Sequence, residues 1–171
     1  MRLEQFNQLE CDACYQLLRQ CCVSTRWIER MEQARPFTDL EQLQHSADQI
    51  WQQLAMPDYL EAFEGHPKIG DIDSLKAKYA WTKALASGEQ SGAAQASEAV
   101  LQALAEGNEA YEKRFGFIFI VCASGKSAEE MLQLLQQRLD NDLETELKIA
   151  AAEQAKITRL RLNKMLNEGE V

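Results

Sequence analysis

The chain has 171 residues, of which 18 are basic and 27 acidic, so its formal net charge is −9. This length is typical of one domain whose core is large enough to fold without disulfides or a structural metal. The negative charge argues against a nucleic-acid partner, because a general binder of phosphate backbones needs a basic face. A small anionic substrate stays possible, since one local arginine can bind it.

The composition predicts an all-α protein. Gly and Pro number only 8 and 3, while Leu, Ala, Glu, Gln and Arg, which lose little entropy in a helix, fill much of the sequence. We therefore expect a single-domain helical bundle over residues 1–171, with one short extended segment near residues 115–123.

The sequence predicts a cytoplasmic protein that does not cross a membrane. Its longest apolar run, residues 115–123, is nine residues long, whereas a spanning helix needs roughly 20. The start, MRLEQFNQLE, lacks a hydrophobic signal core, and the end, NEGEV, is no peroxisomal tripeptide. Five cysteines without a signal peptide indicate reduced thiols, and Cys11-x-x-Cys14 has no second pair to complete a zinc site. We expect no bound metal.

Taken in chain order, the first half predicts four helices, over residues 9–21, 24–32, 40–54 and 57–63. Pro57 suits the first turn of the fourth helix. Polar residues followed three positions later by Glu predict capping boxes. They are Asn7 with Glu10, Thr38 with Glu41 and, further on, Ser127 with Glu130.

The second half begins with a turn-rich break at residues 65–71, GHPKIGD. A helix over 75–85, a break at 87–92 and a helix over 97–114 follow. The run FGFIFIVCA at 115–123 is aromatic and β-branched, which favours a short buried strand or extended segment. Helices over 128–139 and 143–166 close the chain. The expected apolar side of the last helix comprises Leu147, Ala150, Ala151, Ile157, Leu160 and Leu162.

Of the two histidines, His66 is the candidate for proton transfer. It lies between Gly65 and Pro67, and Pro67 restricts the preceding residue to extended conformations. A fixed imidazole at a helix junction suits general acid–base chemistry near neutral pH. The alternative is a histidine that only packs the loop. His45 lies among polar neighbours in a predicted helix, and we interpret it as solvated.

Three further features could contribute to a site. Glu89 and Gln90 follow Gly88, whose small size allows a ligand to approach the backbone, and Glu89 could orient His66 or share its proton. The alternative is a solvated acid at a helix N-terminus. Arg159 and Arg161 are two positions apart and so point to different faces. An inward arginine could bind a carboxylate or ureido carbonyl, whereas an outward one would form a surface ion pair.

The extended segment could present backbone N–H and C=O groups to a flat, amide-rich heterocycle, or it could be a buried part of the core. The sequence has no Walker loop, no GxGxxG, no GxSxG and no HExxH. An enzyme of this sequence is therefore expected to use no cofactor.

These pieces, in this order, resemble the 2-oxo-4-hydroxy-4-carboxy-5-ureidoimidazoline (OHCU) decarboxylase family of urate degradation. The resemblance covers nearly the whole chain. It rests on FNQLE, AFEGHPKIGD, SGEQ, NEAYEKRFGFIFIVCASGKS, RLDND and ELKIAAAEQAKITRLRL. The ordered set of HPKIGD, EQ, RFGF-x-F and KIT-x-LRL is its specific part.

The resemblance implies an all-α, cofactor-free carboxy-lyase, typically a homodimer, which converts OHCU to (S)-allantoin and CO₂. It assigns catalytic roles to His66, Glu89 and Arg161. We hypothesise that His66 is the proton donor, and which of His66 and Glu89 moves each proton stays open at the level of sequence. The resemblance assigns substrate contacts to Pro67, Ser87, Gln90, Phe119, Ile120, Val121, Cys122 and Ala123. No metal is implied.

Two other interpretations remain open at the level of sequence. The chain could be a helical binding module, in which GHPKIGD is a structural turn and the last helix an interaction surface. It could instead be an enzyme acting on another ureido or imidazoline acid. Convergence of His66, Glu89 and Arg161 would favour either enzyme over the binding module, and substrate tests would separate the two enzymes.

Overall fold

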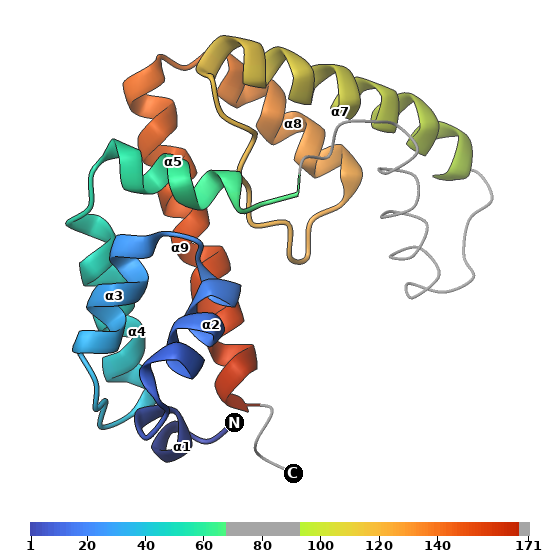
Figure 1. Cartoon of the computed structure of the whole chain (residues 1–171). Coiled ribbons are helices and arrows are strands. Elements are labelled where there is room, and N and C mark those ends of the chain that lie inside the picture. The colour runs from blue at the N-terminus through green and yellow to red at the C-terminus, as the bar shows by residue number, and fades with distance from the viewer. Residues whose placement is uncertain (68–92, 168–171) are drawn as a thin grey trace. The chain divides into compact units, whose positions relative to one another are not determined.

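The computed structural model describes residues 1–67 and 93–167, and these residues form eight helices and no strand (Figure 1). The all-α class predicted from composition is confirmed over this part of the chain. The helices are α1 (Leu3–Asn7), α2 (Cys11–Cys21), α3 (Thr25–Gln33), α4 (Leu40–Gln52), α5 (Met56–Glu64), α7 (Ala93–Phe115), α8 (Ala128–Leu139) and α9 (Leu143–Asn167).

Most predicted helix bounds agree with these to within two residues, and α8 matches its prediction at both ends. Helix α1 was not predicted, and α7 begins at Ala93 rather than at residue 97. The helix predicted over 75–85 lies outside the described residues. The predicted extended segment is shorter than expected because Phe115 completes α7, after which Gly116 adopts a φ of 81° and ends the helix.

The three predicted capping boxes had different outcomes. Ser127 caps α8 as predicted, because its side chain accepts a hydrogen bond from the backbone N–H of Glu130. At α4 the cap lies one residue later: Asp39 accepts from the N–H of Gln42 at 2.7 Å.

The box predicted at Asn7 was wrong, because Asn7 is the last residue of α1. Its side-chain amide donates to the carbonyl of Phe37 at 2.8 Å and accepts from the N–H of Phe37 at 2.9 Å. Both polar atoms of Asn7 therefore fix the segment before α4 instead of capping α2.

The chain forms two compact units. The first comprises residues 1–66 and 147–171 and contains α1–α5 and nearly all of α9. In this unit α4 packs against α9: the indole N–H of Trp51 donates to the carbonyl of Ala151 at 2.9 Å. Helix α3 packs against α4, where the indole of Trp27 donates to the carbonyl of Ala47 at 3.1 Å.

The second unit comprises residues 67–146 and contains α7, α8 and the segment between them. Helices α7 and α8 pack closely at Gly107, where an added Cβ would lie 2.6 Å from Cδ2 of Leu135. Aromatic rings gather at the end of α7: the ring of Tyr111 lies 4.6 Å from that of Phe115 and 5.3 Å from that of Phe119, between centroids.

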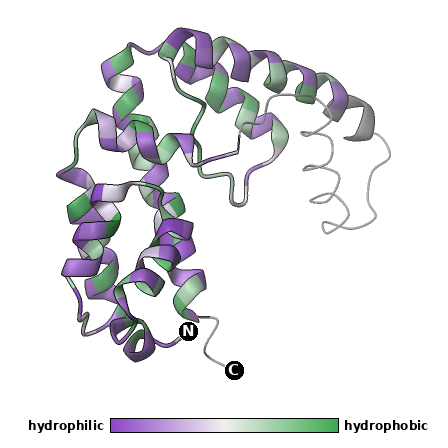
Figure 2. Cartoon of the chain, viewed as in Figure 1, coloured by the Kyte–Doolittle hydropathy of each residue, from purple (hydrophilic) through white to green (hydrophobic). Residues whose placement is uncertain are grey.

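Hydrophobic and hydrophilic residues alternate along the helices of both units, as Figure 2 shows. On α9 six buried positions recur every four residues, so that successive members lie on adjacent turns and form a stripe that winds slowly around the helix. They are Glu146, Ala150, Gln154, Thr158, Leu162 and Leu166, and Ala151 and Glu153 beside them are buried as well. We call the set of six the buried face of α9. The prediction that Leu160 belongs to the apolar side was wrong: Leu160 is 47% exposed, because it lies two positions from Thr158.

Candidate functional site

His66 lies immediately after α5, at a point where two chain segments approach closely. The preceding Gly65 packs on Val23, and an added Cβ at Gly65 would lie 2.6 Å from Cβ of Val23. The backbone N–H of His66 donates to the carbonyl of Phe63 at 3.1 Å. The sequence therefore fixes the backbone of His66 through a close glycine contact and a helix-terminal hydrogen bond.

The imidazole of His66 is half-buried and contacts the buried face of α9. Its Nε2 lies 2.5 Å from the side-chain oxygen of Gln154. The amide nitrogen of Gln154 donates to the hydroxyl of Thr158 at 3.1 Å. This pair of contacts joins the histidine at the end of α5 to two successive turns of α9.

The surroundings of His66 favour its neutral form. Burial lowers the pKa of His66 below its ordinary value of 6.5, and the positive charge of Arg161 lowers it further. The hydrogen bond to Gln154 acts in the opposite direction, because it stabilises the imidazolium. His66 is therefore ready to accept a proton at neutral pH.

Arg161 stands in the same unit as His66, and the two are close enough for the arginine charge to affect the pKa of the histidine. The guanidinium is exposed and lies 3.5 Å from the carbonyls of Gln20 and Cys21, at the end of α2. Of the carboxylates in the described residues, none pairs with Arg161. Its charge is thus available to an anionic or carbonyl-bearing ligand.

Arg159 has different surroundings from Arg161, as their separation by two positions on a helix predicts. Its guanidinium pairs with the carboxylate of Asp48 at 2.5 Å and donates to the side chain of Gln44 at 3.3 Å. Both partners belong to α4. The structure therefore gives Arg159 the role of an ion pair between helices, and leaves Arg161 as the candidate ligand-binding arginine of the two.

The remaining described candidates belong to the second unit. Pro67 is exposed. The five candidates from Phe119 to Ala123 lie in a segment without regular secondary structure, in which Ile120 and Cys122 are buried. Within the described residues, no acceptor bonds the backbone N–H groups of residues 118–123. These N–H groups can serve a ligand rich in carbonyl oxygens.

Carbonyl groups of this segment are fixed by cationic side chains. The guanidinium of Arg138 donates to the carbonyl of Ile120 at 2.6 Å, and the ammonium of Lys126 donates to the carbonyl of Cys122 at 2.8 Å. The same guanidinium lies over the ring of Phe119, 4.6 Å from its centroid. The backbone of the segment is thereby held in place from one side.

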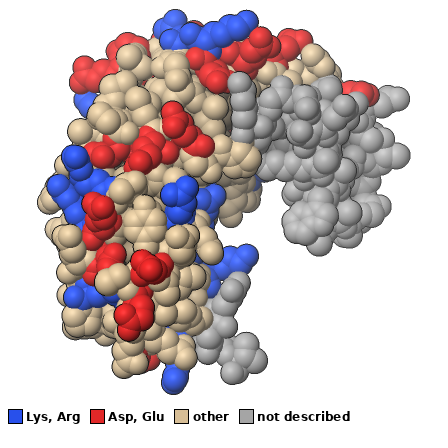
Figure 3. Space-filling view, in the orientation of Figure 1, with Lys and Arg blue, Asp and Glu red and all other residues tan. Residues whose placement is uncertain are grey.

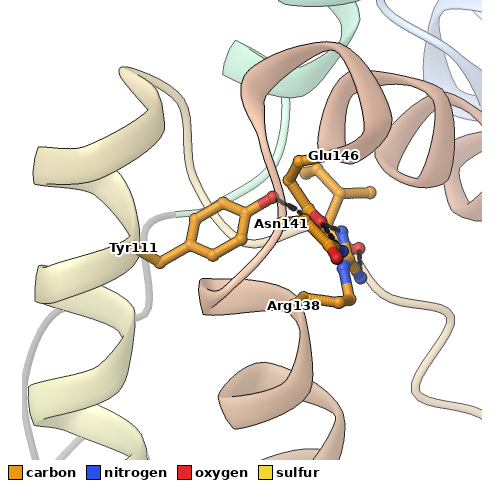
Figure 4. A network of polar contacts seen from close by, with 5 residues as sticks. Tyr111, Arg138, Asn141 and Glu146 are labelled. Carbon is orange, nitrogen blue, oxygen red and sulfur yellow. Dashed lines mark hydrogen bonds and ion pairs between the residues drawn. The ribbon is translucent and has the colours of Figure 1, made fainter.

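Arg138 is in turn held by a buried polar network, which Figure 4 shows in close view. Its Nε donates to the carboxylate of Glu146 at 2.6 Å, and Asn141 donates to the other carboxylate oxygen at 3.0 Å. Tyr111 donates its phenolic proton to the same carboxylate. Burial and this carboxylate raise the pKa of Tyr111, so the phenol keeps its proton.

Ser87, Glu89 and Gln90 lie outside the described residues, so the structure brings together two of the three catalytic candidates, His66 and Arg161. Sequence reasoning missed Gln154 and Thr158. A signal was present, because Gln154, Thr158 and Arg161 follow one another at spacings of four and three residues, which places them on neighbouring turns of one helix face.

The cysteines behave as small hydrophobic residues or surface thiols. Cys14, Cys21, Cys22 and Cys122 are buried, and Cys11 is exposed. Burial raises the pKa of Cys21 to about 11 and that of Cys22 to about 12, which keeps both as thiols. Among the described residues, no group of three or more His, Cys, Asp or Glu side chains has the spacing of a metal site.

The described surface carries side chains of both charges. Lys and Arg side chains lie among Asp and Glu side chains on the face that Figure 3 shows. No helix of the described residues has the length and apolar character needed to cross a bilayer.

Comparison with known proteins gives consistent matches. The family model for OHCU decarboxylase matches residues 7–163. The chain is 40% identical over 148 residues to "Uric acid degradation bifunctional protein TTL" of Arabidopsis thaliana. The matched region covers 86% of the chain and 46% of that protein. It is 28% identical over 177 residues to the uric acid degradation bifunctional protein of a Bacillus species, covering 33% of that protein. The chain thus spans between a third and a half of these relatives.

Two other matches cover nearly all of the compared protein. A 2-oxo-4-hydroxy-4-carboxy-5-ureidoimidazoline decarboxylase of Haloferax volcanii is 25% identical, over 95% of this chain and 94% of its own length. The crystal structure of an OHCU decarboxylase in the presence of (S)-allantoin superposes with a TM-score of 0.70 and 38% identity, over 93% of this chain and 99% of that one. Together with the family model, these matches show that the chain belongs to the OHCU decarboxylase family.

Proposed function

We propose that the chain catalyses the decarboxylation of OHCU to (S)-allantoin, the last step of urate conversion to allantoin. The observation that carries the proposal is that His66 and Arg161 lie near each other. A half-buried imidazole with a lowered pKa lies near an exposed arginine that no described carboxylate neutralises. Proton transfer and the binding of an anionic ureido acid need these two groups.

The chemistry of OHCU suits a site built from side chains alone. The bond between the ring and the carboxylate breaks, and its electron pair moves toward the neighbouring C=N unit while CO₂ leaves. The ring nitrogen takes up one proton. The hydroxyl proton is then lost as the ring carbonyl forms, and a proton returns to the carbon that bears the ureido group. Because the substrate itself accepts the electron pair, no cofactor is needed as an electron sink.

The roles of the residues follow from their surroundings. Neutral His66 accepts the hydroxyl proton and acts as the proton donor to carbon, and Glu89 assists one of these transfers. Arg161 binds an anionic or carbonyl group of the substrate. Pro67, Ser87, Gln90 and the backbone from Phe119 to Ala123 contact the ring and the ureido group. Support comes from the N–H groups of residues 118–123, which have no acceptor among the described residues.

The proposal also covers domain organisation, oligomeric state, location and partners. Residues 1–171 form one OHCU decarboxylase-like domain, which the family match over residues 7–163 supports. The chain acts as a homodimer in the cytoplasm. It uses neither metal nor nucleic acid.

The test generates OHCU in situ from urate, with urate oxidase and 5-hydroxyisourate hydrolase, and follows circular dichroism after the chain is added. We expect rapid formation of one allantoin enantiomer. His66→Asn should lose this acceleration, roughly 10²–10⁴-fold for a general acid–base. The matched control is His45→Asn, because His45 is exposed on α4. Slow racemic decay with folded wild-type protein, or full turnover by His66→Asn, would contradict the proposal.

A further inference from the structure

Gln154 is the polar side chain that contacts the imidazole of His66, and it is only 1% exposed. A buried amide is costly unless both of its ends find hydrogen-bonding partners. Here the amide nitrogen donates to the hydroxyl of Thr158 at 3.1 Å, and the amide oxygen faces Nε2 of His66 at 2.5 Å. Both ends are satisfied by residues of the same unit.

The orientation of this amide determines which imidazole nitrogen carries the proton. A carbonyl oxygen only accepts hydrogen bonds, so the Nε2 that it contacts must carry a hydrogen. In the neutral imidazole the other nitrogen, Nδ1, is then the acceptor. At the far end of the side chain, the hydroxyl of Thr158 accepts the hydrogen bond of the amide nitrogen.

We propose that Gln154 is a positioning residue for His66: its side-chain carbonyl holds the Nε2–H, so that Nδ1 exchanges the proton with the substrate. This inference rests on the proposed decarboxylation and adds to it the reacting atom and the residue that selects it.

The arrangement suits both proton transfers of the reaction, which are the uptake of the hydroxyl proton by His66 and the donation of a proton to carbon. When Nδ1 takes up the hydroxyl proton, the Nε2–H remains bonded to the same carbonyl, so no neighbouring group has to reorient. The positive charge of Arg161, which lies on α9 as Gln154 does, lowers the pKa of His66 and so disfavours a long-lived imidazolium. The proton is therefore passed on to the substrate carbon rather than retained by the histidine.

The test compares Gln154→Leu, which has no acceptor, with Gln154→Glu, which keeps one. Long-range ¹H–¹⁵N spectra of the full chain can resolve the histidines, because there are only two of them and His45 is an exposed reference. In wild type and in Gln154→Glu we expect a bare Nδ1 and a slowly exchanging Nε2–H at His66. In Gln154→Leu the Nε2–H should exchange rapidly and the two neutral tautomers should mix.

Kinetics give the second measurement. Gln154→Leu should lower kcat roughly 10–100-fold with little change in KM, which is less than the roughly 10²–10⁴-fold of general acid–base catalysis because His66 itself is retained. Gln154→Glu should recover part of the loss. Gln133→Leu, at an exposed position of α8, is the matched control. Far-UV circular dichroism verifies that each variant folds.

The outcomes separate this inference from the proposed function. An Nδ1–H tautomer in wild type, or an unchanged Nε2–H signal in Gln154→Leu, would overturn the role of Gln154 even in an active enzyme. The expected spectra in a chain that does not turn over OHCU would instead refute the proposed reaction and leave the tautomer assignment standing.

Discussion

Two arginines of α9 show how strongly the role of a residue depends on helix geometry. Arg159 and Arg161 are separated by one residue, yet Arg159 pairs with Asp48 on α4, whereas Arg161 contacts backbone carbonyls at the end of α2. The spacing predicted that the two would face different surroundings. It could not predict which one would be paired, because that depends on where the distant α4 packs.

A variant of Arg161 tests its two expected effects together. Arg161→Gln should lower kcat/KM about 10–100-fold, as expected for the loss of a charge-assisted hydrogen bond of roughly 1.5–3 kcal/mol. It should also raise the pKa of His66, because the positive charge that disfavours the imidazolium is removed. Steady-state kinetics and NMR titration of His66 measure the two effects.

Arg159→Gln is the control for this experiment, because Arg159 pairs with Asp48 rather than lying near His66. It should leave kcat/KM within about twofold of wild type and should not shift the pKa of His66. Equal kinetic losses in the two variants would show that Arg161 has no special role.

At the scale of single residues, the candidate site was only partly predictable from the sequence. His66 was identifiable because Gly65 and Pro67 flank it, and the structure shows that Gly65 is needed for close contact with Val23. Gln154 was not identified, since a glutamine inside a charged helix resembles a solvated residue. Its burial depends on packing of α9 against residues far away in the chain.

At the scale of whole elements, helix positions were predictable because caps, prolines and apolar spacing are local signals. The two ends of α8 follow from Ser127 and from the loss of the apolar pattern after Leu139. The buried face of α9 was harder to predict, because three of its members, Glu146, Gln154 and Thr158, are polar. Polar residues are normally assigned to the solvent side, and here hydrogen bonds compensate for their burial.

Glu146 carries an element-scale prediction, because it joins α9 to Tyr111 of α7 and Arg138 of α8. Glu146→Gln leaves the guanidinium of Arg138 buried without a negative partner. We expect a loss of about 3–5 kcal/mol in the free energy of unfolding, which is typical when one member of a buried pair is removed. Urea unfolding followed by far-UV circular dichroism measures it.

The exposed Glu129 of α8 supplies a matched variant, Glu129→Gln, which should change stability by less than about 0.5 kcal/mol. If Glu146→Gln unfolds at the same urea concentration as this control, the network does not stabilise the fold. In that case Arg138 could hold the carbonyl of Ile120 without its carboxylate partner.

At the scale of the whole molecule, the fold class was predictable and the division into two units was not. Composition alone favours helices over strands. The first unit, however, combines residues 1–66 with residues from 147 onward, so it depends on contacts such as that between Trp51 and Ala151, a hundred residues apart in sequence. No local pattern in either segment specifies such a pairing.

His66 links the stability of the whole molecule to pH. The folded state lowers the pKa of His66 below 6.5, so below about pH 6.5 the unfolded chain binds more protons at this position than the folded chain does. The contribution of neutral His66 to stability is therefore complete above this pH and is lost as the pH falls through the lowered pKa. We expect His66→Gln to abolish this loss of stability at acid pH.

The measurement is the free energy of unfolding between about pH 8 and pH 5 for wild type and His66→Gln. Tryptophan fluorescence is a suitable probe, because Trp27 and Trp51 are buried in the same unit as His66. The stability of wild type relative to the variant should decrease toward acid pH. A difference that is constant, or that grows toward acid pH, would mean that folding does not disfavour the imidazolium. The neutral histidine required by the proposed proton cycle would then lose its physical basis.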